Sequence, residues 1–472
     1  MRQKVISLNA VSNLLLQCNS NYSKSTATAT KTALAVRRHL KPPYYRRTIP
    51  AYPATHKLKE EFPNAGDLDG SGPRLYDYEQ MGDIVRSLPK ISDKIDFVNP
   101  YERPWTRFEK TWHRPWHPFL MSPRKAWNVP SVPRYFDSLN FYKYITKTRL
   151  VDGLNQWYEG IVPPTTSFQM RLIESLIANL ESNQTDIDES ERVTILLQAV
   201  FDAALLTLAQ NVHRLQNCRI SATPRCESFW VRAGFMQIRK LGELAFVLRD
   251  QLAAHIRTKQ PLRPLFKFSN EDELNAEVFD ETVDVKQDVI YSPKVFNMWP
   301  DEKPLWQCAG FEPDSGDEYK SGLLAIKDVS SLNDLLAYWK VEPGEERSIV
   351  QRESLTATAI VSLFSWLNAQ AHSLGFTQYN DIEWPLVSQM ILSDGRDFFF
   401  AIAQLNTIAI NIDVKGFVNN RSNVCYVEGP LRLYDRFDSR RGNFYYLLAD
   451  GTEVEGLNPQ VMTRILQMFI KE

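Results

Sequence analysis

An Asp-Gly pair between two apolar segments near the C-terminus constrains the fold more than any other feature of the chain. The sequence VSQMILS, Asp394-Gly395 and RDFFFAIA predicts a strand, a two-residue type I′ turn and a second strand. Pairing Ser393 with Arg396 gives the ribbon two apolar faces. One face carries Val387, Gln389, Ile391, Phe398, Phe400 and Ile402, and the other carries Met390, Leu392, Phe399 and Ala401. Because both faces are apolar, both must be covered, which requires a layered fold.

Further helix and strand signals surround this hairpin. Ser354 can cap a helix whose apolar residues from Ile360 to Leu374 recur at helical spacing, and Gly375 is suited to end it. Strands are expected around residues 408–412, 423–427 and 444–448. A last helix should begin at Pro459, with Asn458 as its cap. Residues 351–472 are therefore predicted to form a C-terminal α+β domain.

The middle of the chain, residues 134–265, is predicted to be a mainly helical domain. One helix would bury Phe168, Leu172 and Leu176, and Ser190 could cap a second. Apolar spacing continues over residues 235–256, but SFWVRAGFMQIR at its start is equally compatible with a strand. Residues 266–350 form an acidic segment of mixed strand and loop signals, which we interpret as a solvated surface. The expected fold class is α+β, with a helical middle region, a C-terminal mixed domain and an extended N-terminal arm.

Composition places the chain among ordinary globular proteins. It has 472 residues, 43% of them hydrophobic and 24% charged, which excludes a fibrous or largely disordered chain and suggests several domains. The net charge is −1, but the charges are unevenly distributed. The first 59 residues contain eleven Lys and Arg, and the first acid is Glu60.

The N-terminal residues 1–45 have the pattern of a mitochondrial transit peptide. Apolar residues between Val5 and Leu16 alternate with polar ones as in an amphipathic helix, and an acid-free, Ser/Thr-rich stretch follows. This predicts import into the mitochondrial matrix. A basic tail without targeting function is the alternative. The sequence has no run of eighteen apolar residues, so no membrane span is expected.

Residues 46–133 are predicted to form an extended basic and aromatic arm, because prolines are frequent and no regular periodicity is sustained. Guanidinium and ammonium groups can neutralise phosphates while indole rings stack on bases, so this pattern suits RNA. The alternative is that the tryptophans only dock the arm on the folded body. The candidate RNA contacts are Arg103, Arg107, Lys110, Arg114, Arg124, Lys125, Trp105, Trp112 and Trp116.

Candidate catalytic and metal sites are weak. His113 and His117 have the spacing of a zinc motif, but Pro115 and Pro118 interrupt the helix that would align them. Asp67 and Asp69 resemble the start of a calcium loop that lacks its closing Glu. Ser122 and Lys125 match only one short part of a serine-lysine motif. The five cysteines are odd in number and scattered, so neither disulfides nor zinc are expected. We predict no catalytic, cofactor or metal site.

Several segments resemble a family of metazoan mitochondrial ribosomal proteins that includes large-subunit protein thirty-seven and programmed cell death protein nine. The segments are SLFSWLNAQAHSLGF and PLVSQMILSDGRDFFFAIAQLNTIAI, with YITKTRLVDGL at 144–154 and SATPRCESFWVR at 221–232. The last two are more similar to protein thirty-seven. The resemblance covers roughly residues 130–472. It implies a non-catalytic subunit of the large mitochondrial ribosomal subunit, with rRNA, other large-subunit proteins and the related family member as partners.

Two other classes of function stay open at this point. A mitochondrial RNA-binding or translation factor outside the ribosome would also explain the arm. A matrix enzyme is a weaker alternative, because the sequence has no glycine-rich phosphate loop, nucleophile elbow or HExxH motif.

Overall fold

Two β-sheets enclose one long helix. The computed structural model describes residues 86–89, 126–135, 138–182, 188–236, 239–280, 283, 293–296, 298, 300–301, 305–311, 316–378, 381–410, 420–448 and 450–471. All of them belong to one unit, Leu75–Glu472. None of the described helices is long and apolar enough to cross a membrane.

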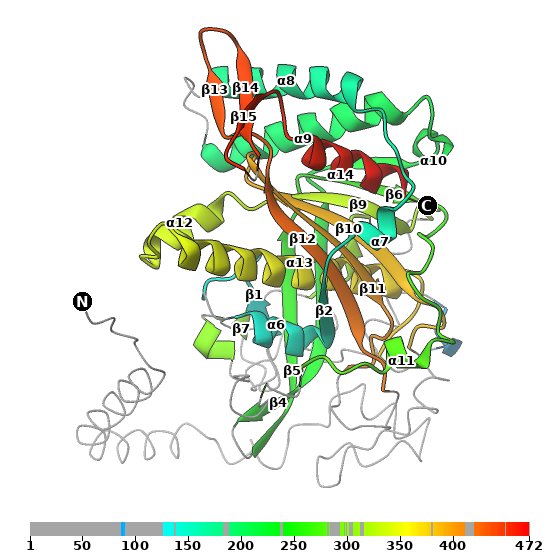
Figure 1. Ribbon diagram of the computed structural model, residues 1–472. Coiled ribbons are helices and arrows are strands. Elements are labelled where there is room, and N and C mark those ends of the chain that lie inside the picture. Colours follow the sequence, from blue (N-terminus) through cyan, green and yellow to red (C-terminus); the bar gives the residue numbers. More distant parts are fainter. Residues whose placement is uncertain are drawn as a thin grey trace, which may run out of the picture. The chain divides into compact units, whose positions relative to one another are not determined.

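The main sheet has seven strands in the order β2-β12-β11-β10-β9-β6-β3 (Figure 1). The pairs β9–β10 and β2–β12 are parallel, and the other neighbours are antiparallel. Its strands are β2 (Thr148–Asp152), β3 (Arg219–Ala222), β6 (Ala254–Thr258), β9 (Ser321–Asp328), β10 (Leu386–Ser393), β11 (Asp397–Leu405) and β12 (Asn423–Arg432).

The second sheet has five strands in the order β7-β1-β5-β4-β8, and a third, small sheet has the order β13-β14-β15. The five-stranded sheet consists of β1 (Ala126–Val129), β4 (Arg225–Met236), β5 (Arg239–Gln251), β7 (Pro300–Asp301) and β8 (Cys308–Ala309). The small sheet consists of β13 (Arg436–Asp438), β14 (Asn443–Leu447) and β15 (Glu453–Glu455).

The helices form layers on the sheets. Helix α13 (Glu345–Ser373) contacts strands of both large sheets, and α8 (Thr165–Ser182), α9 (Glu189–Leu208) and α14 (Pro459–Ile470) cover the other face of the main sheet. The remaining helical segments are α6 (Leu139–Thr146), α7 (Asn155–Tyr158), α10 (His213–Gln216), α11 (Glu271–Leu274), α12 (Ser331–Tyr338) and the 3₁₀ turn Pro293–Phe296. This arrangement is an α+β fold, as predicted.

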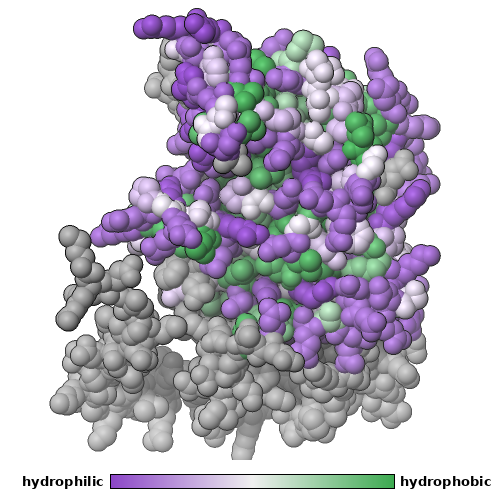
Figure 2. Space-filling model, viewed as in Figure 1, coloured by the Kyte–Doolittle hydropathy of each residue, from purple (hydrophilic) through white to green (hydrophobic). Residues whose placement is uncertain are grey.

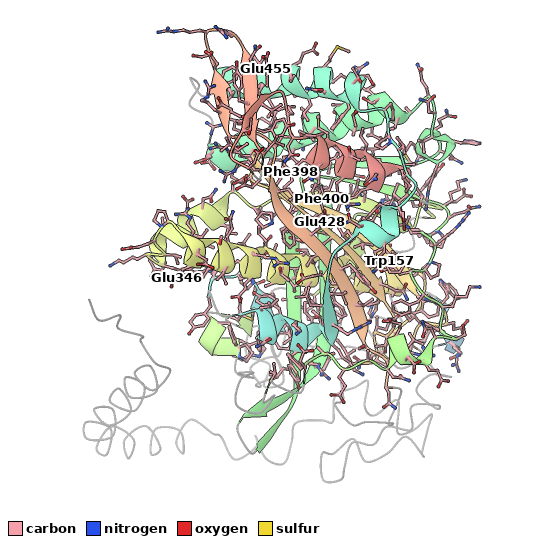
Figure 3. All side chains as sticks on the ribbon, in the orientation of Figure 1. Trp157, Glu346, Phe398, Phe400, Glu428 and Glu455 are labelled. Atoms are coloured by element: carbon pink, nitrogen blue, oxygen red, sulfur yellow. The ribbon has the colours of Figure 1, made fainter. Side chains whose placement is uncertain are left out.

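The β10–β11 hairpin is covered on both faces, as predicted. Phe398 and Phe400 pack in the cluster under α9 and α14, whereas Leu392 and Phe399 pack in the cluster around α13. Figure 3 labels Phe398 and Phe400 at the level of the main sheet.

The turn of this hairpin differs from the expected type I′ turn. Ser393 pairs with Phe398 rather than with Arg396, so the turn has four residues. Within it only Gly395 has a positive φ, +92°. Oδ1 of Asp394 accepts hydrogen bonds from the backbone N–H groups of Arg396 (2.9 Å) and Asp397 (2.8 Å), which stabilises the longer turn. Relative to the expected pairing, the partner of each β10 residue is shifted by two residues along β11. Side chains of a strand alternate between its faces with period two, so a shift of two leaves each side chain on the predicted face.

Helix α13 contains many polar side chains although most of the helix is buried. It begins at Glu345 rather than near Ser354, and it is buried on all sides from Ser354 to Ser373. Its polar side chains bind the neighbouring sheets: Asn368 donates to the carbonyl of Phe229 (3.0 Å), and Gln370 accepts from the backbone N–H of Gly322 (2.7 Å). Buried polar groups are stable only when paired in this way. The helix therefore joins the two sheets through specific hydrogen bonds as well as through packing.

The predicted ends of two helices are confirmed. Asn458 caps α14 by accepting from the backbone N–H of Gln460 (3.0 Å), and Pro459 is the first helical residue. Gly375, with φ +91°, follows the end of α13. By contrast, α9 begins at Glu189 after Asp188, so Ser190 is not its cap.

Three other expectations need correction. Residues 134–265 were expected to be mainly helical, but they contain β2 to β6 as well as α6 to α10. The segment left open at 235–256 includes the end of β4, all of β5 and the start of β6. Residues 408–410 are not in a strand. Asp381 accepts hydrogen bonds from Thr407 Oγ1 (2.8 Å) and from the backbone N–H of Ile408 (2.8 Å), so this N–H bonds to a side chain and not to a neighbouring strand. The boundaries expected at 266 and 351 separate strands of one sheet, because β6 precedes residue 266, β9 lies between the two boundaries and β10 follows residue 351.

Candidate functional site

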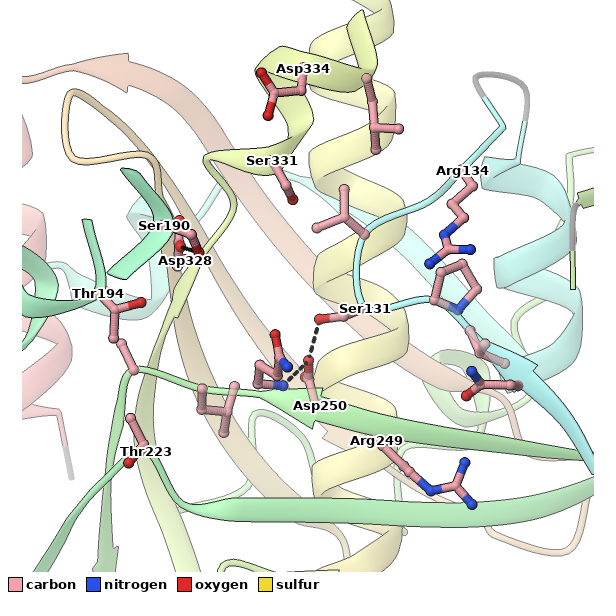
Figure 4. A pocket seen from close by; sticks show the side chains of 18 of the residues that line it. Ser131, Arg134, Ser190, Thr194, Thr223, Arg249, Asp250, Asp328, Ser331 and Asp334 are labelled. Carbon is pink, nitrogen blue, oxygen red and sulfur yellow. Dashed lines mark hydrogen bonds between the residues drawn. The ribbon is translucent and has the colours of Figure 1, made fainter. Parts of the chain in front are cut away.

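The described residues enclose a polar pocket of about 870 Å³ where the end of the predicted arm meets the body (Figure 4). Its walls come from five places: residues 128–134, the connection from β3 to β4 at Thr223 and Pro224, the end of β5 with the following residues 252–253, the first turns of α9, and the segment from the end of β9 into α12. Segments that are far apart in the sequence therefore meet here.

A buried ion pair forms the floor of this region. Nζ of Lys327 on β9 lies 2.5 Å from Oδ1 of Asp250 on β5, and their side chains are 0% and 3% exposed. Lys327 also donates to the backbone carbonyl of Ser131 (2.9 Å) and to Oγ of Ser362 on α13 (2.7 Å). Three hydrogen bonds satisfy the ammonium group, which burial of a charge requires.

Ser131 connects this ion pair to the end of the arm. Its Oγ donates to Oδ1 of Asp250 (2.8 Å), as Figure 4 shows, while its carbonyl accepts from Lys327. Just before it, β1 is a strand between β5 and β7. The last residues of the predicted arm are thus held by backbone pairing and by a charged network in the core.

Burial sets the electrostatics of the pair. Desolvation lowers the pKa of Lys327, and the nearby Asp250 carboxylate opposes that shift. Oδ1 of Asp250 accepts three hydrogen bonds, whereas Oδ2 has no hydrogen-bond partner among the described residues. Removing either partner would leave an uncompensated charge in the core.

Several polar groups that line the pocket are paired with residues of neighbouring elements. Of its described lining residues, none is His, Cys, Lys or Tyr. Asp328 accepts from Ser190 Oγ (2.8 Å) and from the N–H of Ser330 (2.8 Å), and Arg249 pairs with Glu227 (3.1 Å). These contacts join α9 to the end of β9, and β5 to β4.

Other titratable groups with shifted pKa values lie deeper in the core. Burial lowers the pKa of His372 to about 4 and that of His255 to about 3. Burial also raises the pKa of the Cys425 thiol. His255 stacks on Trp366 with ring centroids 5.5 Å apart and is fully buried. All three side chains are enclosed in the packed core.

The sequence-predicted sites are only partly within the described structure. All nine candidate RNA contacts fall in residues 103–125, and His113, His117, Asp67, Asp69 and Ser122 also lie outside the described residues. Trp127 is described: it is half-buried on β1 and packs against the core around α13, which is the docking role considered for the aromatic residues. Across the described ranges, no three His, Cys, Asp or Glu are placed to hold a metal ion.

Sequence reasoning missed the Lys327–Asp250 pair. A signal exists for Lys327, which is the charged residue in the apolar strand SGLLAIKD. No comparable signal marks Asp250 or Ser131, because their relation to Lys327 arises only when β5, β9 and the arm come together.

The structure is a layered α+β fold in which residues 126–135, the end of the predicted arm, contact the core. A family model described as mitochondrial 28S ribosomal protein S30 (PDCD9) matches residues 8–472. The chain therefore belongs to the PDCD9 family of mitochondrial ribosomal proteins. This confirms the ribosomal family that the sequence resembles. The description names the 28S subunit, however, and does not support the predicted large-subunit assignment.

Proposed function

We propose that the chain is a structural constituent of the mitochondrial ribosome and supports mitochondrial translation through contacts with rRNA and other ribosomal proteins. The observation that carries this proposal is the family match over residues 8–472. The anchored arm supports it, because a basic extension held firmly at one end can follow an irregular RNA surface at the other. The role is non-enzymatic, and the site of action is the mitochondrial matrix.

The ribosomal subunit to which the chain belongs is a separate part of the proposal. Residues 144–154 and 221–232 resemble large-subunit protein thirty-seven, and on this ground we propose the large subunit, with the related family member among its neighbours. The family's description instead names the 28S subunit. The two assignments make different predictions for sedimentation.

The test is a sucrose gradient of mitochondrial lysate that contains the tagged full-length chain. We expect the chain to sediment with ribosomal particles, and to follow large-subunit rRNA when low magnesium separates the subunits. Co-sedimentation with small-subunit rRNA would reject the large-subunit assignment. Sedimentation as a free protein in moderate salt would favour a translation factor outside the ribosome.

The arm has its own test. We propose that Arg103, Arg107, Lys110, Arg114, Arg124 and Lys125 contact rRNA phosphates, with Trp105, Trp112 and Trp116 stacking on bases. Reversing Arg103, Arg107, Arg114, Arg124 and Lys125 to Glu should reduce crosslinking to rRNA while the folded body keeps its stability. Unchanged crosslinking would mean that these residues only dock the arm or face solvent.

A further inference from the structure

The β13–β14 hairpin carries a second concentration of arginines, far from the arm in the sequence. Figure 1 shows this hairpin projecting from the layered body, and Figure 2 shows a hydrophilic surface over the same part of the molecule. The strands pair Asp438 with Asn443, so residues 439–442 form the tip. The tip sequence is Ser439-Arg440-Arg441-Gly442.

Hydrogen bonds hold the tip in one conformation. Asp438 accepts from the backbone N–H of Arg440 through Oδ1 (3.0 Å) and from that of Gly442 through its carbonyl (2.8 Å). Gly442 has φ +70°, a conformation that favours glycine. A pre-ordered loop loses little conformational entropy on binding.

Aromatic packing fixes the base of the hairpin on the body. Phe444 is 1% exposed and contacts Phe437 and Tyr434, with ring centroids 4.7 and 4.9 Å apart. The tip therefore projects from a rigid support.

The neighbouring arginines are already used within the protein. Arg436 forms two bonds with Glu453 (2.8 and 2.9 Å), and Arg432 forms two with Asp397 (2.8 and 3.2 Å). Arg396 donates to the backbone carbonyls of Tyr434 and Asp435. These three arginines stabilise the hairpin and its base.

Arg440 and Arg441 differ from these three. Both are exposed, and within the described part of the chain neither side chain has a hydrogen bond, an ion pair or an aromatic ring beneath it. Two adjacent guanidinium groups on an ordered, projecting loop are suited to bind oxyanions bidentately.

We propose that the tip of the β13–β14 hairpin binds the phosphate backbone of RNA through Arg440 and Arg441. RNA fits better than an acidic protein, because a four-residue tip is far smaller than the roughly 800 Å² per partner of a stable protein interface. Phosphate contacts need only a few well-placed cations. The proposal rests on the proposed ribosomal function for the identity of the RNA, which is rRNA, but not for the binding itself.

The test is the salt dependence of RNA binding by the purified full-length chain. The probes are labelled fragments transcribed from the two mitochondrial rRNAs, and labelled polyglutamate serves as the acidic-protein probe. For Arg440→Gln/Arg441→Gln, we expect about tenfold weaker binding to at least one rRNA fragment. The slope of log affinity against log salt should fall by about 1.5, since each phosphate contact contributes about 0.7 to 0.9. Arg440→Lys/Arg441→Lys should keep most of the slope, because lysine also neutralises phosphate.

The matched control is Lys267→Gln/Lys340→Gln, which removes the same charge from two exposed positions away from the hairpin. It should leave affinity and slope close to those of the unmodified chain. Equal effects of both double variants, or no effect of the tip variant, would overturn the proposal. So would an equal loss of polyglutamate binding by the tip variant. Failure of the chain to sediment with ribosomes would reject the ribosomal function, yet it would leave the RNA-binding measurement informative by itself.

Discussion

Nζ of Lys327 lies 2.5 Å from Oδ1 of Asp250, and neither side chain is more than 3% exposed. The two residues are on strands of different sheets, and Ser131 of the arm and Ser362 of α13 complete the network. This one ion pair therefore joins both sheets, the central helix and the end of the N-terminal arm.

Breaking this pair should destabilise the protein strongly. Lys327→Met leaves the Asp250 carboxylate buried without its cation and should lower the free energy of unfolding by about 3 to 5 kcal/mol. Lys327→Met/Asp250→Leu should cost less than the single change, because no charge is left unpaired. Urea denaturation of the full-length chain measures both. The control is Lys259→Met: the Lys259–Glu318 pair is also 2.5 Å long but is 44% and 70% exposed, so solvent screening should make its loss much less costly than that of Lys327. Equal costs for Lys327→Met and Lys259→Met would show that the buried pair does not stabilise the fold.

Gly395 and Gly153 have similar backbone conformations, so the effects of alanine substitutions at the two positions can be compared. Gly395 and Gly153 have φ of +92° and +95°, so alanine is strained at both. A Cβ on Gly395 would lie 3.0 Å from Leu196 Cδ2 on α9, whereas nothing lies within 4 Å of a Cβ on Gly153. We expect Gly153→Ala to cost about 1 to 2 kcal/mol and Gly395→Ala to cost more. Thermal unfolding of the two variants checks this order. A smaller effect at Gly395 would mean that α9 does not pack closely on the hairpin turn.

Trp366 should be the most sensitive aromatic position of α13. It is 2% exposed, stacks on His255 and donates from its indole N–H to the carbonyl of Ala309 (3.3 Å). Trp366→Ala should cost about 3 to 5 kcal/mol through lost burial and a cavity. Trp384→Ala, at a 44% exposed position, is the control and should cost much less.

The cavity that Trp366→Ala would leave should reduce the cost of a second substitution, at Gly322. A Cβ on Gly322 would lie 2.5 Å from Cζ2 of Trp366, so Gly322→Ala should destabilise the unmodified protein. In the Trp366→Ala background the clash with Trp366 is removed, while Gln370 Nε2 still lies 2.7 Å from the added Cβ, so the added cost should be smaller but not zero. Strictly additive free energies would contradict this packing relationship.

Two buried histidines make stability depend on pH. Burial lowers the pKa of His372 from 6.5 to about 4 and that of His255 to about 3, so the unfolded chain binds more protons than the folded one below pH 6.5. The stabilisation is present above pH 6.5 and is lost as pH falls toward 4, by roughly 3 kcal/mol for His372 alone. Urea unfolding between pH 4 and 7 should show this loss, and His372→Leu should reduce it. A His372→Leu profile as steep as the original would exclude His372 as its source.

Features of the fold that depend only on residues close together in the chain could be predicted from the sequence. The Asn458 cap, Pro459 in the first turn of α14, the stop at Gly375 and the two apolar faces of the hairpin follow from local hydrogen bonding and side-chain alternation. The strand at 225–236 could not be distinguished from helix, because an apolar run is compatible with both until its pairing partner is known.

By itself, the sequence determined the α+β class, the alternation of the hairpin and the resemblance to mitochondrial ribosomal proteins. Only the tertiary structure decided that the middle and C-terminal segments share one sheet, and that α13 is buried from Ser354 to Ser373 between two sheets. Only the tertiary structure shows that Lys327 pairs with Asp250, 77 residues away. It also distinguishes the exposed Arg440 and Arg441 from arginines that are bound within the hairpin, such as Arg436. The physical reason is the same in each case: burial and charge pairing depend on which distant segments come into contact, and local periodicity contains no information about that.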